Sequence, residues 1–140
     1  MTPTEFLSKQ DPERKNLLVS VHKVITENDK TVKAEVGKMM GKDMILYNAP
    51  GTFKYGLASV KEHMSLHCLP IYGDKKLYEK YEKLFSKAKL QKGCINFKNA
   101  EEAPLKIIKD LIKDCSKIDL AAIREEYLRK KKEAKKTPKK

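Results

Sequence analysis

The sequence predicts an α+β fold, in which an antiparallel sheet of about four to five strands packs against N-terminal and C-terminal helices. Near both ends of the chain, apolar residues recur at intervals of three and four, the period of an amphipathic helix. Between positions 43 and 72, glycine, proline and aromatic residues separate short apolar runs, as they do between strands and turns. At 140 residues, the chain has the length of one domain that can bury its own core.

The first helical region precedes the expected sheet. Asp11 and Pro12 favour a helix start, and we expect this helix from 12 to about 27. A second, shorter helix is expected from about 31 to 40, where Gly41 would end it. The apolar stripe of the first helix consists of Leu17, Leu18, Val21, Val24 and Ile25.

Consecutive strands are expected next, and their succession favours antiparallel pairing. The run 44–47 is predicted to be a strand or a short turn into one, and residues 48–51 (Asn-Ala-Pro-Gly) are predicted to be a loop. Two further strands, 53–60 and 63–71, are expected to form a hairpin.

The C-terminal half is expected to add three helices and one strand. The apolar spacing predicts a helix from about 75 to 89, and alternation predicts a short strand over 92–97. A helix is expected from 104 to about 115, and Asp119 is expected to cap a last helix that runs into the lysine-rich end.

The positive charge is concentrated at the C-terminus. The formal net charge is +12, and residues 129–140 hold eight lysines or arginines and one glutamate. We therefore expect one folded domain over residues 1–128 and a disordered lysine-rich tail over residues 129–140. Such a tail can neutralise phosphates, which gives the alternative function of weak, salt-dependent nucleic-acid binding; otherwise it is a solubilising end. The residues that would bind nucleic acid are Arg129, Lys130, Lys131, Lys132, Lys135 and Lys136.

The cysteines and the hydropathy pattern indicate a cytoplasmic protein. Cys68, Cys94 and Cys115 are odd in number, far apart and without a CxxC pair, which argues against a disulfide framework or a zinc ribbon. No run approaches the roughly 18 apolar residues of a membrane span, and the first residues are polar, unlike a secretion signal. We expect no membrane partner.

Three motifs in order carry a family resemblance. They are Tyr-Asn-Ala-Pro-Gly-Thr-Phe at 47–53, Lys-Glu-His-Met-Ser-Leu at 61–66, and Lys-Gly-Cys-Ile-Asn-Phe at 92–97, followed by Pro104. Over about residues 12 to 115 the chain resembles the YdhG-like family, small bacterial domains of unknown function, some of which are described as frataxin-like intracellular iron chaperones. Asn48 stands where the family usually has glycine, and asparagine tolerates a positive φ. The resemblance implies a curved antiparallel sheet packed against helices, with iron as the cofactor to consider.

Histidines supply the candidate metal ligand. His63 and His67 would share a helix face, but in a strand they lie roughly 13 Å apart and cannot hold the same ion. Ser65 would share their face of the strand. Iron prefers clustered carboxylates, and the acidic clusters here are only 101–102 and 125–126. His63 is therefore the one metal ligand that we expect, for the iron that the resemblance implies.

A ligand pocket is expected where the loop at 47–53 meets the strand that His63 opens. Aromatic rings beside a basic pair would suit a small ligand that carries a carboxylate or another anionic group. Alternatively, these residues only fasten the loop to the sheet. The predicted lining residues are Tyr47, Asn48, Phe53, Tyr55, Lys61 and His63.

Catalytic signatures are sparse. The sequence has no nucleophile elbow, P-loop, GxGxxG or HExxH motif. Cys94 and Cys115 are expected to be core thiols, and Cys68 is expected to face away from His67. We therefore expect a noncatalytic domain, a monomer or a homodimer, that binds a small ligand, a metal ion or a protein partner.

Overall fold

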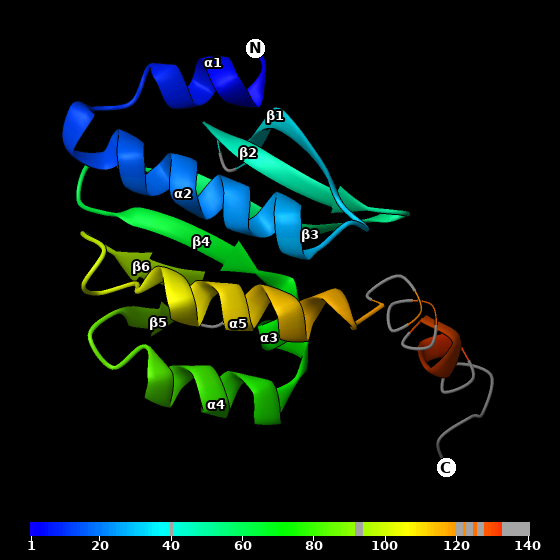
Figure 1. Ribbon diagram of the computed structural model, residues 1–140. Helices are drawn as coiled ribbons and strands as arrows, with labels where there is room; N and C mark the ends of the chain where they lie inside the picture. The colour runs from blue at the N-terminus through cyan, green and yellow to red at the C-terminus, as the bar shows by residue number, and fades with distance from the viewer. Residues whose placement is uncertain (40, 92–93, 120–121, 123–124, 126–127, 133–140) are drawn as a thin grey trace.

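Six antiparallel strands form one sheet, and helices pack across it (Figure 1). The computed structural model describes residues 1–39, 41–91, 94–119, 122, 125 and 128–132. The helices are α1 (Pro3–Ser8), α2 (Pro12–Asn28), α3 (Leu69–Gly73), α4 (Lys75–Leu84) and α5 (Leu105–Ser116). The strands are β1 (Lys33–Met39), β2 (Lys42–Ala49), β3 (Thr52–Ser59), β4 (Met64–Cys68), β5 (Lys89–Gln91) and β6 (Cys94–Phe97).

The sheet order is β1-β2-β3-β4-β6-β5, with every neighbouring pair antiparallel. Figure 1 shows α1, α2, α5 and α4 side by side in front of the sheet, and α2 packs against α5. The predicted α+β class is therefore confirmed, with the N-terminal helix α2 packing against the C-terminal helix α5.

Local sequence signals explain where several elements begin. Thr2 and Glu5 form a reciprocal capping box at the start of α1, because each side chain bonds the other residue's backbone N–H. Pro12 occupies the first turn of α2 as expected, although the Asp11 side chain makes no capping hydrogen bond. Gly41 and Gly51, with φ of 78° and 80°, supply the left-handed backbone of the turns that flank β2.

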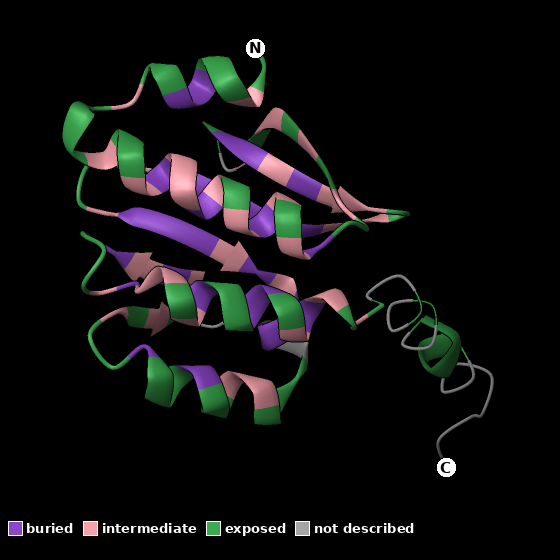
Figure 2. Cartoon of the chain, viewed as in Figure 1, coloured by how far each residue is buried: buried purple, intermediate pink, exposed green. Residues whose placement is uncertain are grey.

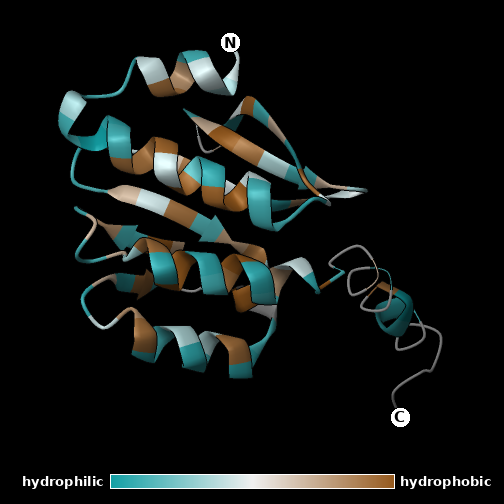
Figure 3. Ribbon diagram, in the orientation of Figure 1, coloured by the Kyte–Doolittle hydropathy of each residue, from teal (hydrophilic) through white to brown (hydrophobic). Residues whose placement is uncertain are grey.

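The core lies between the helix layer and the sheet. The faces of α2 and α5 that are turned toward the sheet are buried in Figure 2 and hydrophobic in Figure 3. On β4, Met64, Leu66 and Cys68 join the core, which places Ser65 and His67 on the opposite face as the strand period requires. The largest fully buried side chains are Tyr47, Tyr55, Tyr81, Lys54, Phe85 and Phe97.

The prediction of a helix over 31–40 is wrong, because this segment forms strand β1. It pairs with β2 along its whole length, from Lys33 opposite Asn48 to Met39 opposite Lys42. Val32, Ala34 and Val36 pack against the core, so the apolar residues follow the period of two as well as a helical spacing. Pairing with β2 therefore determines that this segment is a strand and not a helix.

The sheet has six strands, more than the expected four to five. Besides β1, the additional strand is β5, which lies where the sequence predicted the end of a helix over 75–89. That helix, α4, instead ends at Leu84, after which Phe85 turns into the core with 1% exposure. The apolar residues after Leu84 continued the helical spacing, and this hid the change to a strand.

The last predicted helix lies partly outside the described residues. Asp119 accepts a hydrogen bond from the backbone N–H of Ala122 at 3.1 Å, as expected of a helix cap. Residues 122, 125 and 128–132 are helical, and residues 133–140 of the predicted tail lie outside the described residues. Within the described part of the chain, no helix has the length and apolar character that spanning a membrane requires.

The packing of α5 predicts that two leucines contribute very differently to the free energy of unfolding. Leu111 on α5 is 0% exposed, whereas Leu84 at the end of α4 is 44% exposed. We expect Leu111→Ala to lower the free energy of unfolding by about 2–5 kcal/mol, because it removes buried contacts and leaves a cavity. Leu84→Ala, the matched control, should change it by less than about 0.5 kcal/mol. Urea unfolding measures both; equal effects would contradict the described burial.

Candidate functional site

A β-bulge turns a lysine of β3 into the interior. Tyr47 of β2 lies opposite Tyr55 of β3, but the next residue, Asn48, lies opposite Phe53, so Lys54 is the extra residue on β3. A bulge re-aims a side chain relative to the regular alternation. As a result, the consecutive residues Lys54 and Tyr55 are both buried, and both reach Asp29.

Asp29 is the centre of a buried polar cluster that follows the end of α2. Its Oδ2 atom lies 2.8 Å from Nζ of Lys54 and accepts a hydrogen bond from the Tyr55 hydroxyl at 2.7 Å. Its Oδ1 atom accepts from the backbone N–H of Thr31 at 3.0 Å and from the Thr31 hydroxyl at 2.5 Å. The side chains of Asp29 and Lys54 are 0% and 2% exposed, so the pair is shielded from water.

The hydrogen bonds determine the charge of Asp29. Burial alone would raise the pKa of this carboxyl, but hydrogen bonds from Lys54, Thr31 and Tyr55 outweigh it and hold the pKa below its usual value. Asp29 is therefore ionised at neutral pH, opposite the positive ammonium of Lys54.

A pocket of about 470 Å³ opens over this cluster. Its lining joins the segment after α2, the turn between β2 and β3, and the end of α5. Lys54 lies at its inner side, and the exposed residues Lys30 and Lys117 line its rim. We name it the sheet-end pocket; its residues are Lys30, Thr31, Ala49, Pro50, Lys54, Ser116, Lys117, Ile118 and Asp119.

Two helices end at the sheet-end pocket. α2 ends at Asn28 and α5 at Ser116, so the negative ends of both helix dipoles lie beside it. These dipoles help to stabilise the buried ammonium of Lys54. The formal charges of Lys30, Lys54 and Lys117 exceed those of Asp29 and Asp119 by one, so the pocket is weakly positive.

A second hollow of about 430 Å³ adjoins the first and shares Thr31, Ala49 and Pro50 with it. Asn48 and Glu35 line this hollow and bond to each other, since Nδ2 of Asn48 donates to Oε1 of Glu35 at 2.6 Å. The Glu35 carboxylate of this hollow therefore already has a hydrogen-bond partner within the protein.

Two of the six predicted ligand-binding residues, Tyr47 and Tyr55, are 0% exposed. The Tyr47 hydroxyl lies 2.7 Å from Nδ1 of His22 on α2, and the Tyr55 hydroxyl bonds to Asp29. Both rings therefore belong to the core, and their hydroxyls already have partners within the protein.

The other four predicted residues lie at opposite ends of β3. Asn48 and Phe53 flank the β2–β3 turn, whereas Lys61 and His63 belong to the β3–β4 turn, roughly 26 Å along the strand. Arg14 of α2 holds that second turn by donating to the carbonyls of Lys61 at 3.1 Å and His63 at 3.3 Å. The structure thus does not gather the six residues in one pocket. Ligand binding by any of them, and metal binding by His63, stay predictions.

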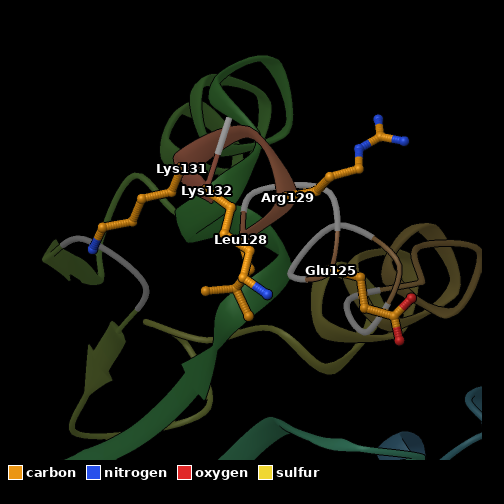
Figure 4. Close-up of a pocket in the computed structure, with 5 residues that line it drawn as sticks. All are labelled: Glu125, Leu128, Arg129, Lys131 and Lys132. Carbon is orange, nitrogen blue, oxygen red and sulfur yellow. The ribbon is translucent and has the colours of Figure 1, made fainter. Parts of the chain in front are cut away.

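The predicted nucleic-acid-binding residues are described only in part. Arg129 to Lys132 are helical and exposed, while Lys135 and Lys136 lie outside the described residues. Figure 4 shows an open pocket of about 590 Å³ here, with Arg129 and Lys131 extending to opposite sides of Leu128. Arg129 and Lys131 therefore do not converge on one point, and nucleic-acid binding stays a prediction.

No family model, curated protein or solved structure matches the chain in comparisons with known proteins. The similarity to the YdhG-like family, and the iron that it implies, stay predictions. Among the described residues, no three histidine, cysteine, aspartate or glutamate side chains gather closely enough to hold a metal ion.

The buried ion pair predicts how stability depends on pH. The pKa of Asp29 is lower in the folded protein than in the unfolded chain, where it is about 4. Its ionised form therefore contributes fully to the free energy of unfolding above about pH 4, and this contribution is lost as the pH falls through the pKa of the folded state. At pH 7, Asp29→Asn should cost about 3–5 kcal/mol, because Lys54 stays buried without its counterion.

Chemical denaturation of the wild type and of Asp29→Asn between pH 3 and pH 7 measures this difference. The difference in free energy of unfolding between the wild type and Asp29→Asn should be constant above about pH 5 and should become smaller on acidification. Glu101→Gln is the matched control, because Glu101 pairs with Lys87 on the surface and its loss should not change stability measurably. A difference in free energy of unfolding that becomes larger in acid would contradict the ionised state of Asp29.

Proposed function

We propose that the protein is a noncatalytic binding domain that holds a small anion, a carboxylate or phosphate group, in the sheet-end pocket. The observation that carries the proposal is the position of Lys54, a buried lysine that lines a pocket instead of being enclosed by apolar side chains. Volumes of a few hundred Å³ are typical of small-molecule sites.

Lys54 has the capacity for one more hydrogen bond. An ammonium group has three N–H donors. Asp29 at 2.8 Å and Thr31 at 3.5 Å are the oxygen contacts of Nζ among the described residues. A ligand oxygen that enters the pocket would accept the third N–H, in a site where water competes little.

The net charge favours a ligand with a single negative charge. Lys30 and Lys117 add two exposed ammonium groups at the rim, where they would attract an anion and close over it. The two helix C-termini and Asp119 oppose a second negative charge. A monoanion balances the excess of one positive charge, so a carboxylate or a singly charged phosphate ester fits best.

Nuclear magnetic resonance titration with acetate and with inorganic phosphate tests the proposal, because backbone amide shifts report millimolar binding and locate it. We expect saturable shifts at Lys30, Thr31 and Lys54. The double variant Lys30→Gln/Lys117→Gln should weaken binding by about three- to tenfold, because it removes two exposed ion contacts.

The matched control is Lys9→Gln/Lys76→Gln, which removes the same charge from two exposed lysines outside the pocket. It should bind both anions like the wild type. Equal weakening by both double variants, or shifts confined to residues 128–132, would mean attraction by net charge alone and would overturn the proposal.

A further inference from the structure

One of the three cysteines differs from the others. Cys68 and Cys115 are 0% exposed, with their sulfur atoms 3.6 Å apart in the core. Cys94, which the sequence predicted to be a core thiol, is half-buried, and its Sγ lies 2.9 Å from Nδ1 of His67. The prediction for Cys94 is wrong because the inward residues of β6 are Ile95 and Phe97.

The pairing of β4 with β6 fixes this contact. His67 lies directly opposite Cys94 in the register, so the two side chains project from the same face of neighbouring strands. Both strands are held in the middle of the sheet order, by β3 on one side and β5 on the other. The pair is therefore held on a rigid support.

The surroundings of the pair combine an apolar ring with amide groups. A Cβ placed on Gly56, which lies opposite His67, would be 3.0 Å from the Phe53 ring, so this ring lies over Gly56 beside the histidine. On the other side, Gln91 lies opposite Cys94. The amide of Asn96 is 3.4 Å from Gln91, and its carbonyl accepts from Ser65 at 2.7 Å.

The thiol and the imidazole are both neutral at physiological pH. Burial raises the pKa of the Cys94 thiol and lowers the pKa of His67. The thiol can then donate its hydrogen to Nδ1, and this imidazole nitrogen can take the proton when sulfur reacts. On this face, Lys89 is the nearest charged residue of β5, while Gly56 and Ala58 on β3 carry no charge.

We propose that Cys94 is a modification site for soft carbon electrophiles of the α,β-unsaturated carbonyl class, with His67 as the base. Sulfur forms a bond to the β-carbon, and the electrons of the carbon–carbon double bond move to the α-carbon. The thiol proton passes to Nδ1 of His67 and then to the α-carbon, which returns the imidazole to its neutral state. The Phe53 ring would cover the alkene, and the Gln91 amide would donate to the carbonyl oxygen.

Reaction of the full chain with N-ethylmaleimide, followed by mass spectrometry of intact and digested protein, tests the site. In the native protein we expect one adduct, on Cys94, and in denaturant three adducts, one on each cysteine. Native labelling of Cys68 or Cys115 at a rate equal to that of Cys94 would overturn the assignment.

The pH dependence of the rate tests the role of His67. With a neutral base in place, the native rate should vary little between about pH 6.5 and 8.5, whereas an unassisted thiol reacts about tenfold faster with each pH unit below its pKa. His67→Gln should restore that steep dependence and slow the reaction at pH 6.5 by about tenfold or more.

His63→Gln is the matched control, since His63 is half-buried at the β3–β4 turn and distant from Cys94 in the register. It should keep the rate and the flat profile of the wild type. A steep profile in the wild-type protein, which needs no variant to fold, or an unchanged profile in folded His67→Gln, would overturn the role of His67.

Discussion

The buried ion pair between Lys54 and Asp29 is the interaction on which one end of the molecule depends. A buried charge without a partner costs several kcal/mol, so the pair persists only where the backbone supplies both charges and their hydrogen bonds together. Asp29 must follow α2 directly, Thr31 must close the loop to β1, and a bulge must turn Lys54 inward. These requirements fix the end of α2 relative to β3.

The same pair is the basis of the anion binding that we propose for this end of the sheet. The helix C-termini and Asp29 lie beside the ammonium group of Lys54 and offset its positive charge, and the rim lysines leave a small positive excess. The Cys94–His67 pair differs from the charged Lys54–Asp29 pair, because both of its groups are neutral. In the reaction that we propose, the sulfur becomes nucleophilic only when its proton is transferred to His67. The two sites that we propose on this sheet thus differ in chemistry, one at its end and one on the face turned away from the core.

The sequence allowed the fold class and most long elements to be predicted, because stripes such as Leu18, Val21 and Ile25 report burial directly. Prediction from the sequence failed where the apolar spacing of a short segment fitted both a helix and a strand, as in β1. It also failed where pairing with a distant strand determined the structure. The sheet-end pocket was missed because bulges leave no periodic signal. The available clue was Lys54, a charged residue inside an otherwise apolar strand. The Cys94–His67 contact depends on the pairing of β4 with β6, across 27 positions of the chain, and no local pattern encodes that register.

The central claim is that the buried ammonium group of Lys54, paired with Asp29, binds an anion that enters the pocket. The most direct measurement is nuclear magnetic resonance of the lysine ammonium groups in nitrogen-15-labelled protein, with Lys54→Met to assign the signal. The account predicts one ammonium group whose hydrogens exchange slowly with water, which is absent in Lys54→Met and shifts when acetate is added. A Lys54 ammonium that exchanges as fast as the surface lysines, or that acetate leaves unmoved, would contradict it.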